Sequence, residues 1–286
     1  MTLPHWSRVK ELISGFTHRV REDRLTLYAG SMAYTTLLSL VPLVAVLFAL
    51  FSAFPGFEAL KQDIQQFLFN NLVPTASDVI ARQVQGFAAN AARMSAVGVL
   101  ALVVVALLLI SSVDRTINQI FRVGQGRRWS VAFAIYWSVL TLGPLLMGVS
   151  LALTSYVVSL ELFQDGALSA LRGYLIQLAP MVASWLAFLV LYLLVPNMRV
   201  RVKHAMAGAV LAAILFEISK EIFAFYVTSF PSYQAIYGAL AAVPILFVWI
   251  YLCWLIVLLG AELTAYLGEV EKQQQREEPL DADAVS

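Results

Sequence analysis

The sequence predicts an all-α integral membrane protein with six transmembrane helices and both termini on the cytoplasmic side. Of its 286 residues, 60% are hydrophobic and 13% are charged, and the mean hydropathy is +0.78. Soluble globular domains are about half apolar and a quarter charged. Six apolar runs reach the roughly 20 residues that a helix needs to cross the hydrocarbon core. Lys and Arg gather in alternate connections between these runs, as expected when basic segments stay in the cytoplasm.

The predicted spans are residues 27–54, 94–113, 130–160, 173–195, 205–228 and 238–266. Lys and Arg number five in residues 1–26, four in 114–129, three in 196–204 and two after the last span, against four in the opposite connections. Both ends of the chain are therefore predicted to be cytoplasmic. The chain opens with a charged segment before a long apolar run, so the first span is predicted to remain in the mature protein.

Three segments lie outside the transmembrane domain of residues 27–268. In residues 1–26, apolar side chains recur at spacings of three and four between basic ones, which predicts an amphipathic helix on the anionic inner leaflet. Residues 55–93 are predicted to form an external pair of short helices, lying either over the mouth of the bundle or on the outer leaflet. Residues 269–286 are acidic and without an apolar period, which predicts a disordered tail.

The fifth predicted span contains three charged residues in the stretch "FEISKEIFAFY": Glu217, Lys220 and Glu221. Their spacings of three and four place them on one helical face, about 20 Å along the span. Each charge costs at least ~2.5–3.5 kcal/mol at a helix centre, so the side chains are expected to face the bundle or a wet cavity. Two interpretations stay open here: a transport site, or an ion pair that fixes helix packing.

Four predicted spans contain a proline in the outer half: Pro42, Pro144, Pro180 and Pro244. A proline removes a backbone hydrogen bond and tends to kink the helix, and the freed carbonyl must find another partner. By residue counting, these prolines share a depth with Glu217 and Lys220. Kinked helices and charges at one depth are typical of transporter sites.

A second polar group is predicted at the cytoplasmic level. It consists of Asp114, Arg115 and Asn118 after the second span and Glu262 in the sixth. Asp114 and Arg115 can form a local charge pair at the membrane interface. Alternatively, these residues and Glu262 form the cytoplasmic mouth of a path through the bundle.

Features of soluble enzymes are missing from the sequence. It has one cysteine, Cys253, and three separate histidines, His5, His18 and His204, none at the spacing of a zinc helix. No glycine loop of the phosphate-binding kind joins a strand to a helix, and the GxSxG pattern is absent. We therefore expect no enzyme, cofactor, metal or nucleic-acid partner; the expected partner is the lipid bilayer.

Several segments resemble one family: "LTLYAGSMAYTTLLSLVPLVAVLFALF", "LTLGPLL" and the stretch from Phe216 to Leu263. They are similar to the YihY/BrkB family of bacterial inner-membrane proteins, over about residues 20–270. The resemblance implies a multi-pass protein of the cytoplasmic membrane, whose relatives have been labelled ribonuclease BN or linked with serum resistance or export of lipopolysaccharide precursors. A metal-dependent nuclease needs a cluster of His and Asp ligands in a water-accessible site, and the sequence offers none.

The resulting hypothesis is a transporter or flippase-like protein for an amphipathic, lipid-derived envelope molecule. The alternative is a non-transporting scaffold or assembly factor of the envelope, in which the buried charges only specify packing. An ion channel is less favoured, because the charges are of mixed sign and no loop resembles a selectivity filter.

Overall fold

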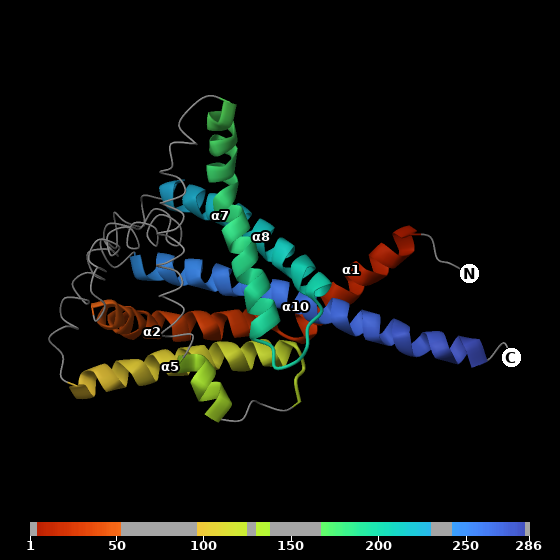
Figure 1. The fold of residues 1–286 in the computed structure, drawn as a ribbon, viewed down its shortest axis with the longest axis horizontal. Coiled ribbons are helices and arrows are strands. Elements are labelled where there is room, and N and C mark those ends of the chain that lie inside the picture. The colour runs from red at the N-terminus through yellow and green to blue at the C-terminus, as the bar shows by residue number, and fades with distance from the viewer. Residues whose placement is uncertain (1–4, 53–95, 125–129, 138–166, 230–241, 284–286) are drawn as a thin grey trace.

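The computed structural model describes residues 5–52, 96–124, 130–137, 167–229 and 242–283, and the elements assigned there are α-helices (Figure 1). Six long helices have the bounds α1 His5–Glu22, α2 Leu25–Ser52, α5 Ala96–Ile120, α7 Ala167–Leu194, α8 Val202–Ser229 and α10 Ala242–Asp283. Residues 130–137 are also helical.

The helices follow the apolar runs of the sequence closely. α2, α5, α7, α8 and α10 coincide with five predicted spans, and α1 coincides with the predicted amphipathic segment. Most of the span predicted at 130–160, and the whole external pair at 55–93, lie outside the described residues. α10 continues as a helix to Asp283, through most of the segment expected to be disordered, and its residues Glu269 and Glu271 make ion pairs there.

α10 is the helix around which the others are arranged. It contacts α8, α2, α5, α7 and α1, while α2 also packs on α5 and α7 on α8. Figure 1 shows α2, α5 and α10 running side by side, with α8 lying diagonally against α10 and α7 crossing α8. α1 and the C-terminal part of α10 extend from the same end of the bundle. We call this the terminal end.

Small residues allow α8 and α10 to approach closely. A Cβ atom added at Gly260 would lie 2.8 Å from the Gly208 carbonyl oxygen and 2.9 Å from the Ala212 Cβ, and one added at Gly208 would overlap the Gly260 oxygen and Thr264 Oγ1. Alanines on both helices are fully or almost fully buried around this crossing: Ala205, Ala209, Ala212, Ala261 and Ala265. Close backbone approach through small residues is how helices associate by van der Waals packing in membranes.

The outer face of α8 is apolar along most of its length. Large apolar side chains are exposed there at intervals of four residues: Val202, Met206, Val210, Ile214, Ile218 and Ile222. A continuous apolar stripe of this length would be unfavourable in water and suits a lipid environment. Among the described residues, Leu102–Ile120 in α5 and Val243–Gln275 in α10 are long and apolar enough to cross a membrane.

Candidate functional site

The first charged region is the ion pair on α8 that the sequence indicated. Lys220 Nζ lies 2.8 Å from Glu217 Oε1, and their side chains are 20% and 33% exposed. Lys220 Nζ also lies 5.5 Å from the centroid of the Phe216 ring. Both charges are thus partly covered without being sealed inside the bundle.

Aromatic rings back the Glu217–Lys220 pair on the bundle side. The Phe216 ring lies 6.0 Å from Phe188 of α7 and 5.9 Å from Trp249 of α10. The third charged residue, Glu221, is exposed and makes no ion pair with another described residue. It lies between Ile218 and Ile222 of the outer stripe, so the three charges differ in their surroundings although they share one helix.

The proline layer is only partly described. Pro42 lies within α2 and is half-buried, and Pro180 lies within α7. Pro244 is exposed, two residues after Ala242, the first residue of α10. Pro144 lies outside the described residues. That these prolines form one layer at the depth of Lys220 stays a prediction.

The second charged region was not predicted as a unit. It lies at the terminal end, where α1, α5 and α10 meet, and consists of Arg19, Asp23, Arg122, Glu262 and Glu269, which we call the Arg19 cluster. Arg19 is 4% exposed. Its guanidinium donates to Glu262 Oε1, to Glu269 Oε2 and, at 3.2 Å, to the carbonyl oxygen of Ile120.

The remaining members of the Arg19 cluster surround this central contact. Asp23 Oδ2 lies 3.7 Å from Arg19 Nε, and Arg122 lies 3.6 Å from Asp23 Oδ1 and 3.8 Å from Glu269 Oε2. Glu262 is completely buried, and its second oxygen, Oε2, accepts no hydrogen bond in the described part of the chain. A buried carboxylate requires a positive partner, which Arg19 supplies from a different helix.

Helix ends bring these side chains together. Arg122 follows α5 with φ 52°, and the Val123 and Arg122 amides donate to the carbonyls of Asn118 and Gln119. A residue in the left-handed conformation together with these two hydrogen bonds forms the Schellman motif, a common way for an α-helix to end. Arg24 also has a positive φ of 49°, and it joins α1 to α2 through a two-residue turn, which fixes the position of Arg19 and Asp23.

The four residues of the predicted cytoplasmic mouth, Asp114, Arg115, Asn118 and Glu262, do not form one site but take part in two separate sets of contacts. Asn118 donates to the Asp114 carbonyl at 2.8 Å and accepts from the Asn197 amide at 2.6 Å, and Tyr136 donates to Asp114 Oδ2 at 2.9 Å. Arg115 is exposed and donates to Ser111 at 3.1 Å. These contacts join α5 to residues 130–137 and 195–197, whereas Glu262 belongs to the Arg19 cluster.

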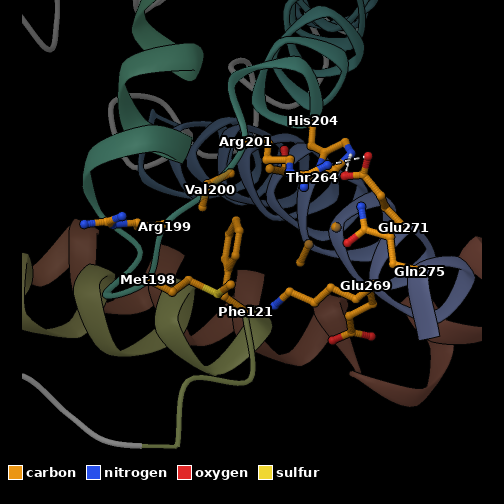
Figure 2. A pocket seen from close by; sticks show the side chains of 13 residues that line it. Phe121, Met198, Arg199, Val200, Arg201, His204, Thr264, Glu269, Glu271 and Gln275 are labelled. Carbon is orange, nitrogen blue, oxygen red and sulfur yellow. Dashed lines mark ion pairs between the residues drawn. The ribbon is translucent and has the colours of Figure 1, made fainter. Parts of the chain in front are cut away.

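A cavity of about 190 Å³ also opens at the terminal end, beside the Arg19 cluster. Figure 2 shows Phe121 projecting toward its centre and the ion pairs of Glu271 along one side. Glu271 pairs with Arg201 and Lys203, and its Oε2 lies 3.3 Å from His204 Nε2. Burial lowers the pKa of His204 below its ordinary value of 6.5, and the Glu271 carboxylate partly opposes this shift.

No group of three His, Cys, Asp or Glu side chains that could hold a metal ion occurs among the described residues. The charged side chains described above form three groups: the Glu217–Lys220 pair, the Arg19 cluster and the residues around Glu271.

Comparison with known proteins identifies the family. The family model for virulence factor BrkB matches residues 16–284. The chain belongs to the BrkB family. A UPF0761 membrane protein of Aeromonas salmonicida is 54% identical over 259 residues, covering 91% of this chain and 89% of the relative. One from Photobacterium profundum is 52% identical over 269 residues, covering 93% and 84%.

These relatives confirm the resemblance found in the sequence and show that this BrkB-family chain is a membrane protein. A further UPF0761 membrane protein, from Aliivibrio fischeri, is 55% identical over 253 residues, covering 88% of this chain and 82% of the relative. No solved structure matches the chain.

Proposed function

We propose that this BrkB-family protein moves an amphipathic, lipid-derived molecule across the membrane, with the polar part of that molecule meeting the Glu217–Lys220 pair. The observation that carries this proposal is the partial exposure of both charges, 33% for Glu217 and 20% for Lys220, on a helix that also exposes a long apolar stripe. Charged groups at membrane depth need water, a counter-charge or a polar headgroup beside them.

α8 offers both kinds of surface that an amphipathic molecule requires. Glu217 and Lys220 can pair with charged or polar headgroup atoms, because each still has exposed surface after pairing with the other. The stripe that includes Ile214, Ile218 and Ile222 is exposed next to them and can contact acyl chains. The exposed Glu221 extends the polar surface.

The alternative function, a non-transporting scaffold of the envelope, also has an observation in its favour. Lys220 and Glu217 already form an ion pair at 2.8 Å on one helix, so no outside ligand is required for charge balance. In this interpretation the pair only holds the aromatic residues Phe188, Phe216 and Trp249 in position.

Lipid exchange in proteoliposomes separates the two functions. A fluorescent short-chain phospholipid serves as the probe, and the double variant Glu217→Gln/Lys220→Met removes both charges together, so that neither is left unpaired. We expect the wild type to exchange the probe between leaflets faster than empty vesicles do. In the double variant the protein-dependent rate should fall at least about tenfold, which corresponds to a barrier higher by about 1.4 kcal/mol.

The matched control is Glu22→Gln, the same side-chain change on an exposed residue of α1, which should keep the wild-type rate. Exchange no faster than in empty vesicles, or equal rates for wild type and double variant, would refute the transport proposal for this site and favour the scaffold.

We also propose that the terminal end faces the cytoplasm of an inner-membrane protein with six spans. In support, basic side chains of three connections gather there, represented by Arg19, Arg122 and Arg201, and the cytoplasmic side retains basic residues. Reporter fusions to residues 1 and 286 should both report a cytoplasmic position, and a periplasmic signal from either would exclude this orientation.

A further inference from the structure

Glu262 is completely buried, and its two carboxylate oxygens differ in whether they accept a hydrogen bond. Its Oε1 accepts from Arg19, which belongs to another helix, 243 residues away in sequence. Its Oε2 accepts nothing within the described residues. The buried negative charge therefore depends on one guanidinium, and one oxygen is open to a proton.

The charged groups near Glu262 in the described part of the chain are the other members of the Arg19 cluster. They are Arg19 on α1, Asp23 in the turn that follows, Arg122 after α5 and Glu269 on α10. Three carboxylates thus share two guanidiniums. Arg122 is 47% exposed and is directed to Asp23 and Glu269, so Arg19 is the cation in direct contact with Glu262.

We propose that a proton and Arg19 are alternative positive partners of Glu262, so that α1 is docked while Glu262 is ionised and released when Glu262 binds a proton. In the exchange, protonation at Oε2 neutralises the buried carboxylate, the Arg19–Glu262 ion pair breaks, and the guanidinium keeps its charge and moves toward water. Docking reverses these steps and returns one proton to the solvent.

Arg19 also pairs with Glu269, whose side chain is 36% exposed, so water can replace this carboxylate when α1 is released. Outside the Arg19 cluster, α1 meets α10 at Tyr266. Gly15 abuts the Tyr266 hydroxyl, and the Phe16 and Tyr266 rings lie 6.3 Å apart. The N-terminal half of α1 extends away from the other helices (Figure 1), with Ile13 58% exposed. Asp23 and Arg24 separate α1 from α2, so the release would occur by rotation at this two-residue turn.

Spin-label distances in the full-length protein in nanodiscs test the exchange. Labels at Ile13→Cys on α1 and Gln274→Cys on α10, both exposed positions, are introduced after Cys253→Ala removes the one native cysteine. As the pH is lowered from alkaline to acidic, we expect a new, different distance to replace the docked one. One exchanged proton changes the docking constant about tenfold per pH unit.

Variants assign the transition to Glu262. Glu262→Gln should lose the pH dependence and lower the docked population at least about tenfold. Arg19→Gln should stay released at every pH, which tests the same exchange without altering Glu262. His18→Gln removes an exposed histidine next to Arg19 in the sequence, and Glu269→Gln removes a neighbouring carboxylate; both variants should keep a transition.

Three outcomes would overturn the proposal. They are a wild-type distance that does not change with pH, a transition that persists in Glu262→Gln, and a transition that His18→Gln abolishes. If a variant fails to fold, the pH titration of the wild-type protein still tests the proposal, because it requires only the native Arg19 cluster.

Discussion

The two charged regions differ in how the fold supports them. Glu217 and Lys220 are three residues apart on one helix and keep 33% and 20% of their side chains exposed. Arg19 and Glu262 come from opposite ends of the chain and are 4% and 0% exposed. The first pair forms wherever α8 forms, whereas the second exists only when α1, α5 and α10 are assembled.

In the proposed function, this difference separates a surface that is open to ligands from a buried contact between helices. A charge with exposed surface can still meet another molecule, and its pairing adds little to stability. A fully buried pair compensates a large desolvation cost and is sensitive to the loss of either member. We therefore expect substitutions at the Arg19 cluster to affect folding first, and substitutions at Glu217 and Lys220 to affect activity first.

The largest expected effect is that of Arg19→Met measured at alkaline pH. This change leaves Glu262 buried and ionised without its partner, and breaking a buried pair costs about 3–5 kcal/mol. Denaturant unfolding in detergent should show this loss, and Lys220→Met should lose clearly less.

The matched comparison for Arg19→Met is Arg21→Met, the same change at an exposed position on α1, which should leave stability near that of the wild type. If Arg19→Met and Lys220→Met were equally destabilising at alkaline pH, the distinction between the two regions would not hold. At acidic pH the cost of Arg19→Met should shrink, because protonated Glu262 no longer needs a cation.

The next largest effect is expected at the crossing of α8 and α10. This crossing connects the two regions, since α8 carries Lys220 and α10 carries Glu262. In Gly208→Ala the new methyl group would overlap the Gly260 carbonyl oxygen and Thr264 Oγ1. Overpacking of this kind costs about 1–3 kcal/mol. Thermal unfolding should show it, with Gly30→Ala as the control, since nothing lies within 4 Å of a Cβ at Gly30.

A Gly208→Ala protein as stable as the wild type would show that α8 and α10 can separate without cost. In that case the pair on α8 and the Arg19 cluster would be held by independent parts of the bundle.

Sequence reasoning found the helices because hydrophobicity is a local property. The run from Leu25 to Ser52 and the run that begins α10 are apolar enough to be read without knowledge of their neighbours. The Glu217–Lys220 pair was found for the same reason, since its members are three residues apart.

The Arg19 cluster could not be predicted in this way, because its central contact spans 243 residues. Arg19 was counted among the basic residues of an interfacial helix, and its burial follows only from how α1 packs on α10. One signal was available: Glu262 lies near the end of an apolar run, so a cation from elsewhere was required. The α8–α10 crossing also had a signal in Gly260, Thr264 and Gly268, which repeat at every fourth position.

The coupling energy between Glu217 and Lys220 is expected to be smaller than the effects described above. Polar pairs in membrane helices average about 0.6 kcal/mol in double-mutant cycles, and partial exposure favours a value no larger than this. The cycle uses Glu217→Gln, Lys220→Met and the double variant, with unfolding free energies measured in the same detergent. A coupling of several kcal/mol would place this pair in the same structural class as Arg19 and Glu262, and would favour the scaffold over the transporter.

The smallest effect is the pH dependence contributed by His204, which lines the cavity at the terminal end near the start of α8. Because burial lowers its pKa below 6.5, the folded state binds fewer protons at this site than the unfolded state. Stability is therefore complete above about pH 6.5 and falls as the pH drops toward the lowered pKa of His204. In His204→Gln this part of the acid loss should vanish in unfolding curves, while α1 release in the spin-label experiment should persist. An unchanged acid profile in His204→Gln would mean that the Arg19 cluster carries the whole pH response, which would sharpen the contrast between the buried cluster and the exposed pair on α8.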